Sequence, residues 1–108
     1  MEIITTEEFK RCAKPLAKRY KSFNQDYQDL LDELERNPHL GIDLGMGYRK
    51  VRMAIKSKGN GKSGGARGIT LDTLEYDGCL YLLFIYDKSD VDSVNLEMIK
   101  KIVSGMNL

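Results

Sequence analysis

The residues best suited to chemistry are basic, and they are concentrated between Tyr48 and Thr70. This window holds seven Lys and Arg side chains, and no acidic residue occurs between Asp43 and Asp72. The remaining residues carry ten basic and sixteen acidic side chains, so the net charge of +1 conceals a dipolar chain. Most charge runs are solvated faces, but cations without interleaved carboxylates favour a polyanion-binding surface. The seven cations are Arg49, Lys50, Arg52, Lys56, Lys58, Lys62 and Arg67.

The basic window divides into a strand and a loop. Residues 50–56 alternate between basic and apolar side chains, a period of two that predicts a half-buried strand with a basic outer face. The sequence KGNGKSGG follows, and its four glycines predict a mobile loop, after which a second strand is expected to begin near Arg67. A phosphate-binding nucleotide loop would require glycine where Lys56 stands, so this class of site is not expected.

The other reactive residue types are scarce. The chain contains two cysteines, Cys12 and Cys79, which we expect to be buried thiols in a reducing cytoplasm, and its only histidine is His39. A zinc site and a Ser-His or Cys-His hydrolase are therefore not expected. The sequence has no apolar run of about 18 residues and no apolar N-terminal stretch, so we expect no membrane span and no signal peptide.

The elements that must position the basic window are predicted from periodicity. A short strand at residues 2–4 precedes two amphipathic helices that form a hairpin, the first opened by a capping box at Thr5 and kinked or divided at Pro15. Residues 41–47 are expected to be a glycine-rich loop. Three strands in a meander follow, the last two joined by a tight turn at Asp77–Gly78, and a short helix ends the chain. These features predict one α+β domain over residues 1–108, with a helical hairpin packed on a small antiparallel sheet.

Three motifs occur in an order that resembles a known family. They are Lys50-Val51-Arg52, Gly64-Gly65-Ala66-Arg67 and the segment from Leu83 to Lys88. With the helical hairpin, they make nearly the whole chain similar to the RelE/ParE superfamily of toxins from bacterial type II toxin–antitoxin systems. The similarity is greatest to the RelE/HigB-like branch.

This resemblance implies a ribosome-dependent messenger-RNA endonuclease in the cytoplasm that acts in the ribosomal A site and is held by a cognate antitoxin. It implies no metal and no cofactor, because the ribose 2′-hydroxyl attacks the adjacent phosphate. By similarity the catalytic residues are Lys50, Arg52, Arg67, Tyr86 and Lys88. Arginine suits the scissile phosphate, which its planar fork binds through paired oxygens. The remaining cations, expected to contact RNA, are Arg49, Lys56, Lys58 and Lys62.

The chain departs from the family pattern at two places. Val94 and Asn95 stand where a tyrosine is common, and Ser89 replaces an arginine that often follows the lysine at 88. Tyr86 could substitute as a proton carrier or belong to the core, so the identities of the general acid and base stay open. Two other functions also stay open: a ParE-like toxin that binds a topoisomerase without cutting nucleic acid, and a passive RNA-binding module.

Overall fold

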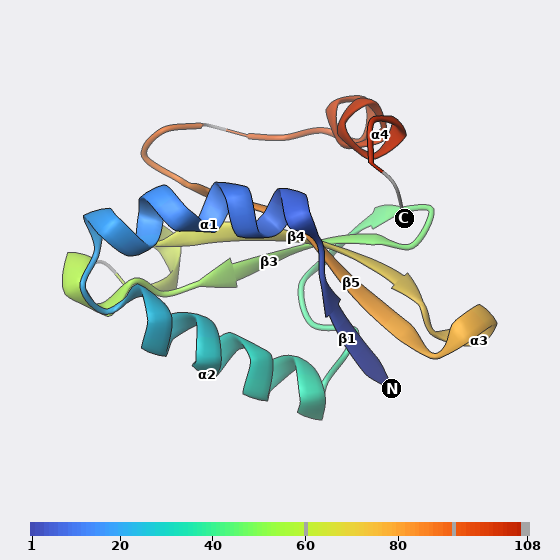
Figure 1. Ribbon diagram of the computed structural model, residues 1–108, viewed down its shortest axis with the longest axis horizontal. Helices are drawn as coiled ribbons and strands as arrows, with labels where there is room; N and C mark the ends of the chain where they lie inside the picture. The colour runs from blue at the N-terminus through green and yellow to red at the C-terminus, as the bar shows by residue number, and fades with distance from the viewer. Residues whose placement is uncertain (60, 92, 107–108) are drawn as a thin grey trace.

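Five strands form the sheet at the centre of the fold: β1 (Glu2–Thr5), β2 (Ile42–Gly45), β3 (Tyr48–Met53), β4 (Ala66–Thr73) and β5 (Cys79–Asp87). The computed structural model describes residues 1–59, 61–91 and 93–106. The strand order is β1-β5-β4-β3-β2, with β1 parallel to β5 and every other pair antiparallel (Figure 1). The predicted α+β class and the mainly antiparallel sheet are confirmed.

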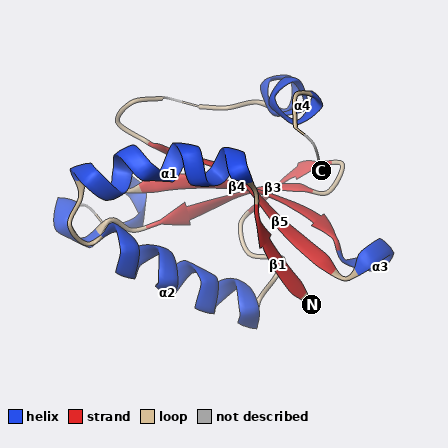
Figure 2. Cartoon of the chain, in the orientation of Figure 1, coloured by secondary structure: helices blue, strands red, loops and turns tan. Residues whose placement is uncertain are grey.

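Four helices accompany the sheet: α1 (Glu7–Arg19), α2 (Phe23–Arg36), the one-turn α3 (Leu74–Asp77) and α4 (Leu96–Ser104). The apolar stripes of α1 and α2 pack on one face of the sheet, in a core that contains Phe9, Leu30 and Val51. α4 packs on the opposite face, where Ile99 is fully buried against Ile69 and Phe84. Figure 2 shows the helical hairpin against the strands and α4 apart from it. The predicted hairpin and C-terminal helix are therefore confirmed.

Local details of the prediction were wrong in several places. Residues 42–45 form strand β2, because this stretch pairs with β3 although its alternation is too short to stand out among glycines. The turn expected at Asp77–Gly78 is the longer turn α3, closed by Gly78 in the left-handed conformation. The N-cap of α1 is Thr6, whose hydroxyl accepts from the backbone N–H of Phe9 at 3.1 Å, and not Thr5.

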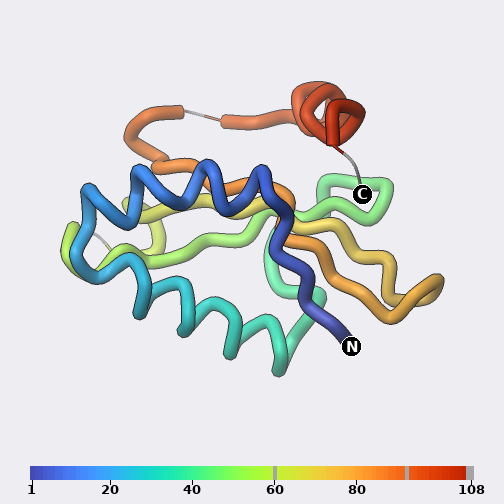
Figure 3. The backbone as a smooth tube through the Cα atoms, viewed as in Figure 1, coloured from blue at the N-terminus to red at the C-terminus, as the bar shows by residue number. Residues whose placement is uncertain are grey.

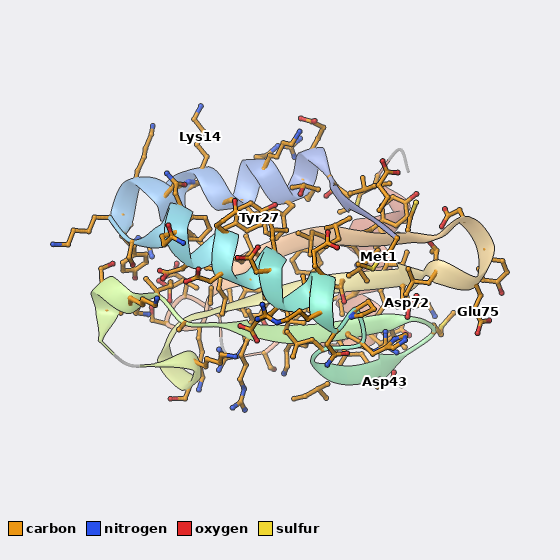
Figure 4. All side chains as sticks on the ribbon, turned by 90° about the horizontal axis from the view of Figure 1, so that it is seen from below. Met1, Lys14, Tyr27, Asp43, Asp72 and Glu75 are labelled. Carbon is orange, nitrogen blue, oxygen red and sulfur yellow. The ribbon has the colours of Figure 1, made fainter. Side chains whose placement is uncertain are left out.

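Pro15 lies inside α1 without dividing it. It occupies an exposed position of the helix, so the carbonyl that loses its hydrogen bond lies on the solvent side, where water can satisfy it. The outward direction of this face is visible in Figure 4, where the neighbouring Lys14 points away from the sheet. The prediction that Pro15 could divide the helix is therefore wrong.

The two faces of the sheet differ in how far they are covered. After β5 the chain turns back along the sheet and reaches α4 at the end where β2 and β3 are joined (Figure 3). α4 contributes to a cluster with Tyr48 and Leu71, which are paired across β3 and β4 at that end. The other end of the same face holds the predicted catalytic residues. Within the described part of the chain, no helix is long and apolar enough to cross a membrane.

Candidate nucleic-acid interface

Three predicted site residues lie side by side across the sheet. Arg52 of β3 is paired with Arg67 of β4, and Arg67 is paired with Tyr86 of β5. Alternation along the strands places all three on the face that α4 packs against, with Lys50 two residues from Arg52 on the same face. Like charges directly opposite each other destabilise a sheet, so the Arg52–Arg67 pair favours a bound anion.

A groove of about 380 Å³ runs along the edge of β3 beyond the point where β2 stops pairing. Gly41 forms part of its wall and has a φ of +107°; a Cβ there would lie 2.5 Å from the carbonyl oxygen of Lys50. Glycine is therefore required for the close approach of this wall to β3. The lining contains three cations, two apolar side chains and no acid: Lys50, Arg52, Lys62, Leu40 and Ile42, with Gly41.

Lys50 and Arg52 are the cations best placed to meet a ligand. Arg52 is exposed and Lys50 is half-buried. Neither side chain forms an ion pair with any acid in residues 1–59, 61–91 or 93–106. Their charge is therefore available to an anion in the groove.

Arg67, expected by similarity to bind the scissile phosphate, is only 5% exposed. Its guanidinium donates to the carbonyl oxygens of Lys62 at 2.8 Å, Ser63 at 2.9 Å and Ala66 at 3.1 Å. Burial lowers the pKa of Arg67, and the positive charge of Arg52 lowers it further. Arg67 therefore holds the glycine-rich loop in place, while its Nε–H takes no part in these three hydrogen bonds.

Tyr86 and Lys88 complete the predicted catalytic set at the end of β5. Tyr86 is half-buried and packs at the border of the α4-side core, and this burial raises its pKa. The positive charge of Arg67 acts in the opposite direction on the Tyr86 hydroxyl. Lys88 is exposed, and its backbone N–H donates to the carbonyl oxygen of Gly65 at 3.1 Å. The last loop residue is thus joined to the end of β5.

The four cations predicted to contact RNA are all paired with acids. Arg49 lies on the face opposite Arg52 and donates to Asp72 at 2.9 Å, where His39 Nδ1 also lies 3.0 Å from the carboxylate. The contacts with Arg49 and the backbone N–H of Leu74 outweigh burial and lower the pKa of Asp72. The other three pairs are Lys56–Asp29, Lys58–Asp87 and Lys62–Glu33.

Asp87, the last residue of β5, is almost completely buried, although the sequence did not single it out. Its carboxylate accepts hydrogen bonds from the Tyr20 hydroxyl, from Lys58 Nζ at 2.9 Å and from Ser89 Oγ at 2.7 Å, and Arg19 lies 3.2 Å away. Burial alone would raise the pKa of Asp87, but these donors hold it well below its ordinary value. The only signal in the sequence is a lone acid at the end of an apolar strand.

The loop contains regular turns despite its four glycines. Two short 3-10 turns, Lys56–Lys58 and Lys62–Gly64, lie within it, and residue 60 is outside the described residues. A Cβ on Gly65 would lie 2.1 Å from the carbonyl oxygen of Met53, so the loop returns in direct contact with β3. The glycines therefore allow close packing as well as turning, and the predicted mobility stays a prediction.

The described residues contain no group of three His, Cys, Asp or Glu side chains that could hold a metal ion. The charged side chains of the groove are two lysines and one arginine, and Tyr86 lies across β4 from Arg52. No known protein-family model matches the chain.

Proposed function

We propose that the protein is a ribosome-dependent messenger-RNA endonuclease, an mRNA interferase toxin of the RelE/HigB-like type that inhibits translation in the cytoplasm. The observation that supports it most is the acid-free groove lined by Lys50, Arg52 and Lys62. A nucleotide carries an anionic phosphate and an apolar base, and this groove offers cations beside Leu40 and Ile42. On this proposal the partners are messenger RNA in the ribosomal A site and a cognate antitoxin.

The proposed reaction is an internal transfer of phosphate. The ribose 2′-oxygen forms a bond to phosphorus as it loses its proton, and the bond from phosphorus to the 5′-oxygen breaks as that oxygen gains a proton. The products are a 2′,3′-cyclic phosphate and a 5′-hydroxyl. Arg52, with Arg67 beside it, would stabilise the extra negative charge of the phosphorane. Lys50, Tyr86 and Lys88 are the candidate proton carriers: Tyr86 is paired with Arg67, Lys50 lies two residues before Arg52 on β3, and Lys88 directly follows β5.

The purified chain tests this proposal when it is incubated with translating ribosomes and the messenger 5′ ends are mapped by primer extension. We expect new ends at defined positions with the wild-type chain, and their loss with Arg52→Gln. Lys14→Gln is the matched control, since Lys14 loses the same charge from an exposed position on α1. A wild-type chain that yields no new ends would contradict the proposal. In that case, inhibition of a topoisomerase would indicate the ParE-like alternative.

A further inference from the structure

The three lysines of the loop between β3 and β4 are each paired with a carboxylate. Lys58 Nζ lies 2.9 Å from Asp87 Oδ1, while Lys56 and Lys62 each lie 3.2 Å from an acid of α2. Those acids are Asp29 and Glu33, one helical turn apart, so they present two carboxylates along one side of α2. The loop lysines are thus occupied by carboxylates of the same chain.

These pairs differ in their access to solvent. The Lys58 side chain is 12% exposed and that of Asp87 is fully buried, so separating this pair would strongly destabilise the fold. By contrast, the side chains are 70% and 42% exposed in Lys56–Asp29, and 52% and 31% exposed in Lys62–Glu33. Exposed pairs of this kind are weak, and a competing anion can replace the carboxylate.

The loop does not depend on the exposed pairs for its position. The backbone N–H of Lys56 donates to Asp26 Oδ2 at 3.1 Å, and that of Ser57 donates to Ser22 Oγ at 2.9 Å. Arg67 holds the other end through the carbonyls of Lys62 and Ser63. Separating Lys62 from Glu33 therefore frees a cation without detaching the loop.

Lys62 lines hollows on both sides of the loop, the acid-free groove and a smaller one beside α2. It lines the acid-free groove with Lys50 and Arg52, and it lines a smaller hollow of about 130 Å³ together with Glu33 and Asp29. A change in the direction of one flexible side chain would transfer its charge from α2 to the groove. Glu33 thus competes directly with any anion that binds there.

We propose that Asp29 and Glu33 are intramolecular substitutes for phosphate: Glu33 withholds Lys62 from the groove, and Asp29 withholds Lys56 in the adjoining hollow, until a polyanion displaces the two acids. This inference deepens the proposed function and rests on it for the identity of RNA as the natural polyanion. A single anion in the groove meets Lys50 and Arg52, whereas a longer chain of phosphates can also reach Lys62 and, in the adjoining hollow, Lys56. Asp29 and Glu33 therefore favour polymers over mononucleotides.

The test compares neighbouring acids on one helix. Asp32 is exposed and forms no ion pair with any described residue, so Asp32→Asn removes the same charge as Glu33→Gln without freeing a lysine. Affinity is measured for inorganic polyphosphate and, separately, for a short single-stranded RNA. We expect Glu33→Gln to bind polyphosphate roughly two- to five-fold more tightly than Asp32→Asn, and Asp29→Asn/Glu33→Gln to gain further.

Equal polyphosphate affinities for Glu33→Gln and Asp32→Asn would overturn the inference, as would a wild-type chain that does not bind polyphosphate. Tighter binding by Glu33→Gln with no cleavage of messenger RNA on ribosomes would uphold the two acids as competitors and reject only the endonuclease. Thermal unfolding of both variants ensures that the comparison is made between folded chains.

Discussion

The cations of the basic window fall into two groups that the sequence does not distinguish. Lys50 and Arg52 lie on the α4-side face and have no acid partner among the described residues. In the second group, each cation is neutralised within the fold by an acid more than twenty residues away in the chain: Arg49, Lys56, Lys58 and Lys62. A window rich in positive charge is therefore much less positive in the folded protein, and its free charge is confined to one groove.

Arg67 belongs to neither group, because its guanidinium is bound to backbone carbonyls. Its substitution is expected to have the largest effect. Arg67→Ala should lower the single-turnover rate of messenger cleavage by a factor equivalent to about 3 kcal/mol or more, if the guanidinium also stabilises the transition state. It should also lower the free energy of unfolding by about 1–3 kcal/mol, because the carbonyls of Lys62, Ser63 and Ala66 lose their donor. Single-turnover cleavage assays with quenched time points measure the rate, and urea unfolding measures the stability.

Arg52→Ala is the control for Arg67→Ala, since Arg52 is exposed and makes no hydrogen bond to the loop among the described contacts. It should lower cleavage while changing stability by less than about 0.5 kcal/mol. Arg67→Lys should recover only part of the activity, because a single ammonium cannot replace the planar fork. If Arg67→Ala affected unfolding alone and left cleavage intact, Arg67 would be a structural residue only.

Asp87 tests whether a buried ion pair stabilises the fold more than an exposed one. Asp87→Ala should lower the free energy of unfolding by about 3 kcal/mol, because Lys58 and Arg19 lose their common partner and Lys58 is nearly buried. The matched control is Asp90→Ala, whose carboxylate is 52% exposed and lies 2.9 Å from Arg19. Its loss should cost less than about 1 kcal/mol. Urea unfolding curves that coincide for the two variants would contradict the assigned role of Asp87.

Stability should depend on pH through the same carboxylate. The pKa of Asp87 is depressed in the folded chain, so its contribution is complete above the unfolded pKa of about 3.9 and is lost as the pH falls below that value. Between pH 7 and pH 3 this group should account for about 1 kcal/mol of lost stability. The pH dependence of unfolding should be shallower in Asp87→Asn than in the wild-type chain. The same pH dependence in both chains would contradict a contribution of Asp87.

The smallest expected effect is on RNA affinity, and it distinguishes two adjacent cations of β3. Lys50→Gln should weaken binding of single-stranded RNA roughly three-fold, because Lys50 lines the groove. Arg49→Gln should leave this affinity nearly unchanged, because Arg49 is paired with Asp72 on the opposite face. Fluorescence anisotropy at fixed salt concentration measures both values. Equal losses would mean that the window acts as a diffuse cationic surface.

Much of the fold follows from periodicity, because helices α1, α2 and α4 and strands β3 and β5 have long apolar patterns. Strand β2 escaped prediction because it is four residues long, lies between glycines and is largely exposed. Of the site, the alternation in β3 correctly placed Lys50 and Arg52 on one face. The burial of Arg67 and the pairing of Lys62 with Glu33 could not be predicted, because both depend on contacts that only the tertiary fold creates.

The most important distinction is between Lys50 and Arg52, whose charge is free to meet RNA phosphate, and Arg49, whose charge is held by Asp72. It is tested most directly by NMR spectra of the arginine Nε–H groups during titration with an oligonucleotide that carries 2′-deoxyribose at every position and cannot be cleaved. We expect the Arg52 signal to shift on binding, the Arg67 signal to follow it, and the Arg49 signal to stay in place. Equal shifts of Arg49 and Arg52, or no shift of Arg52 at saturation, would contradict the account.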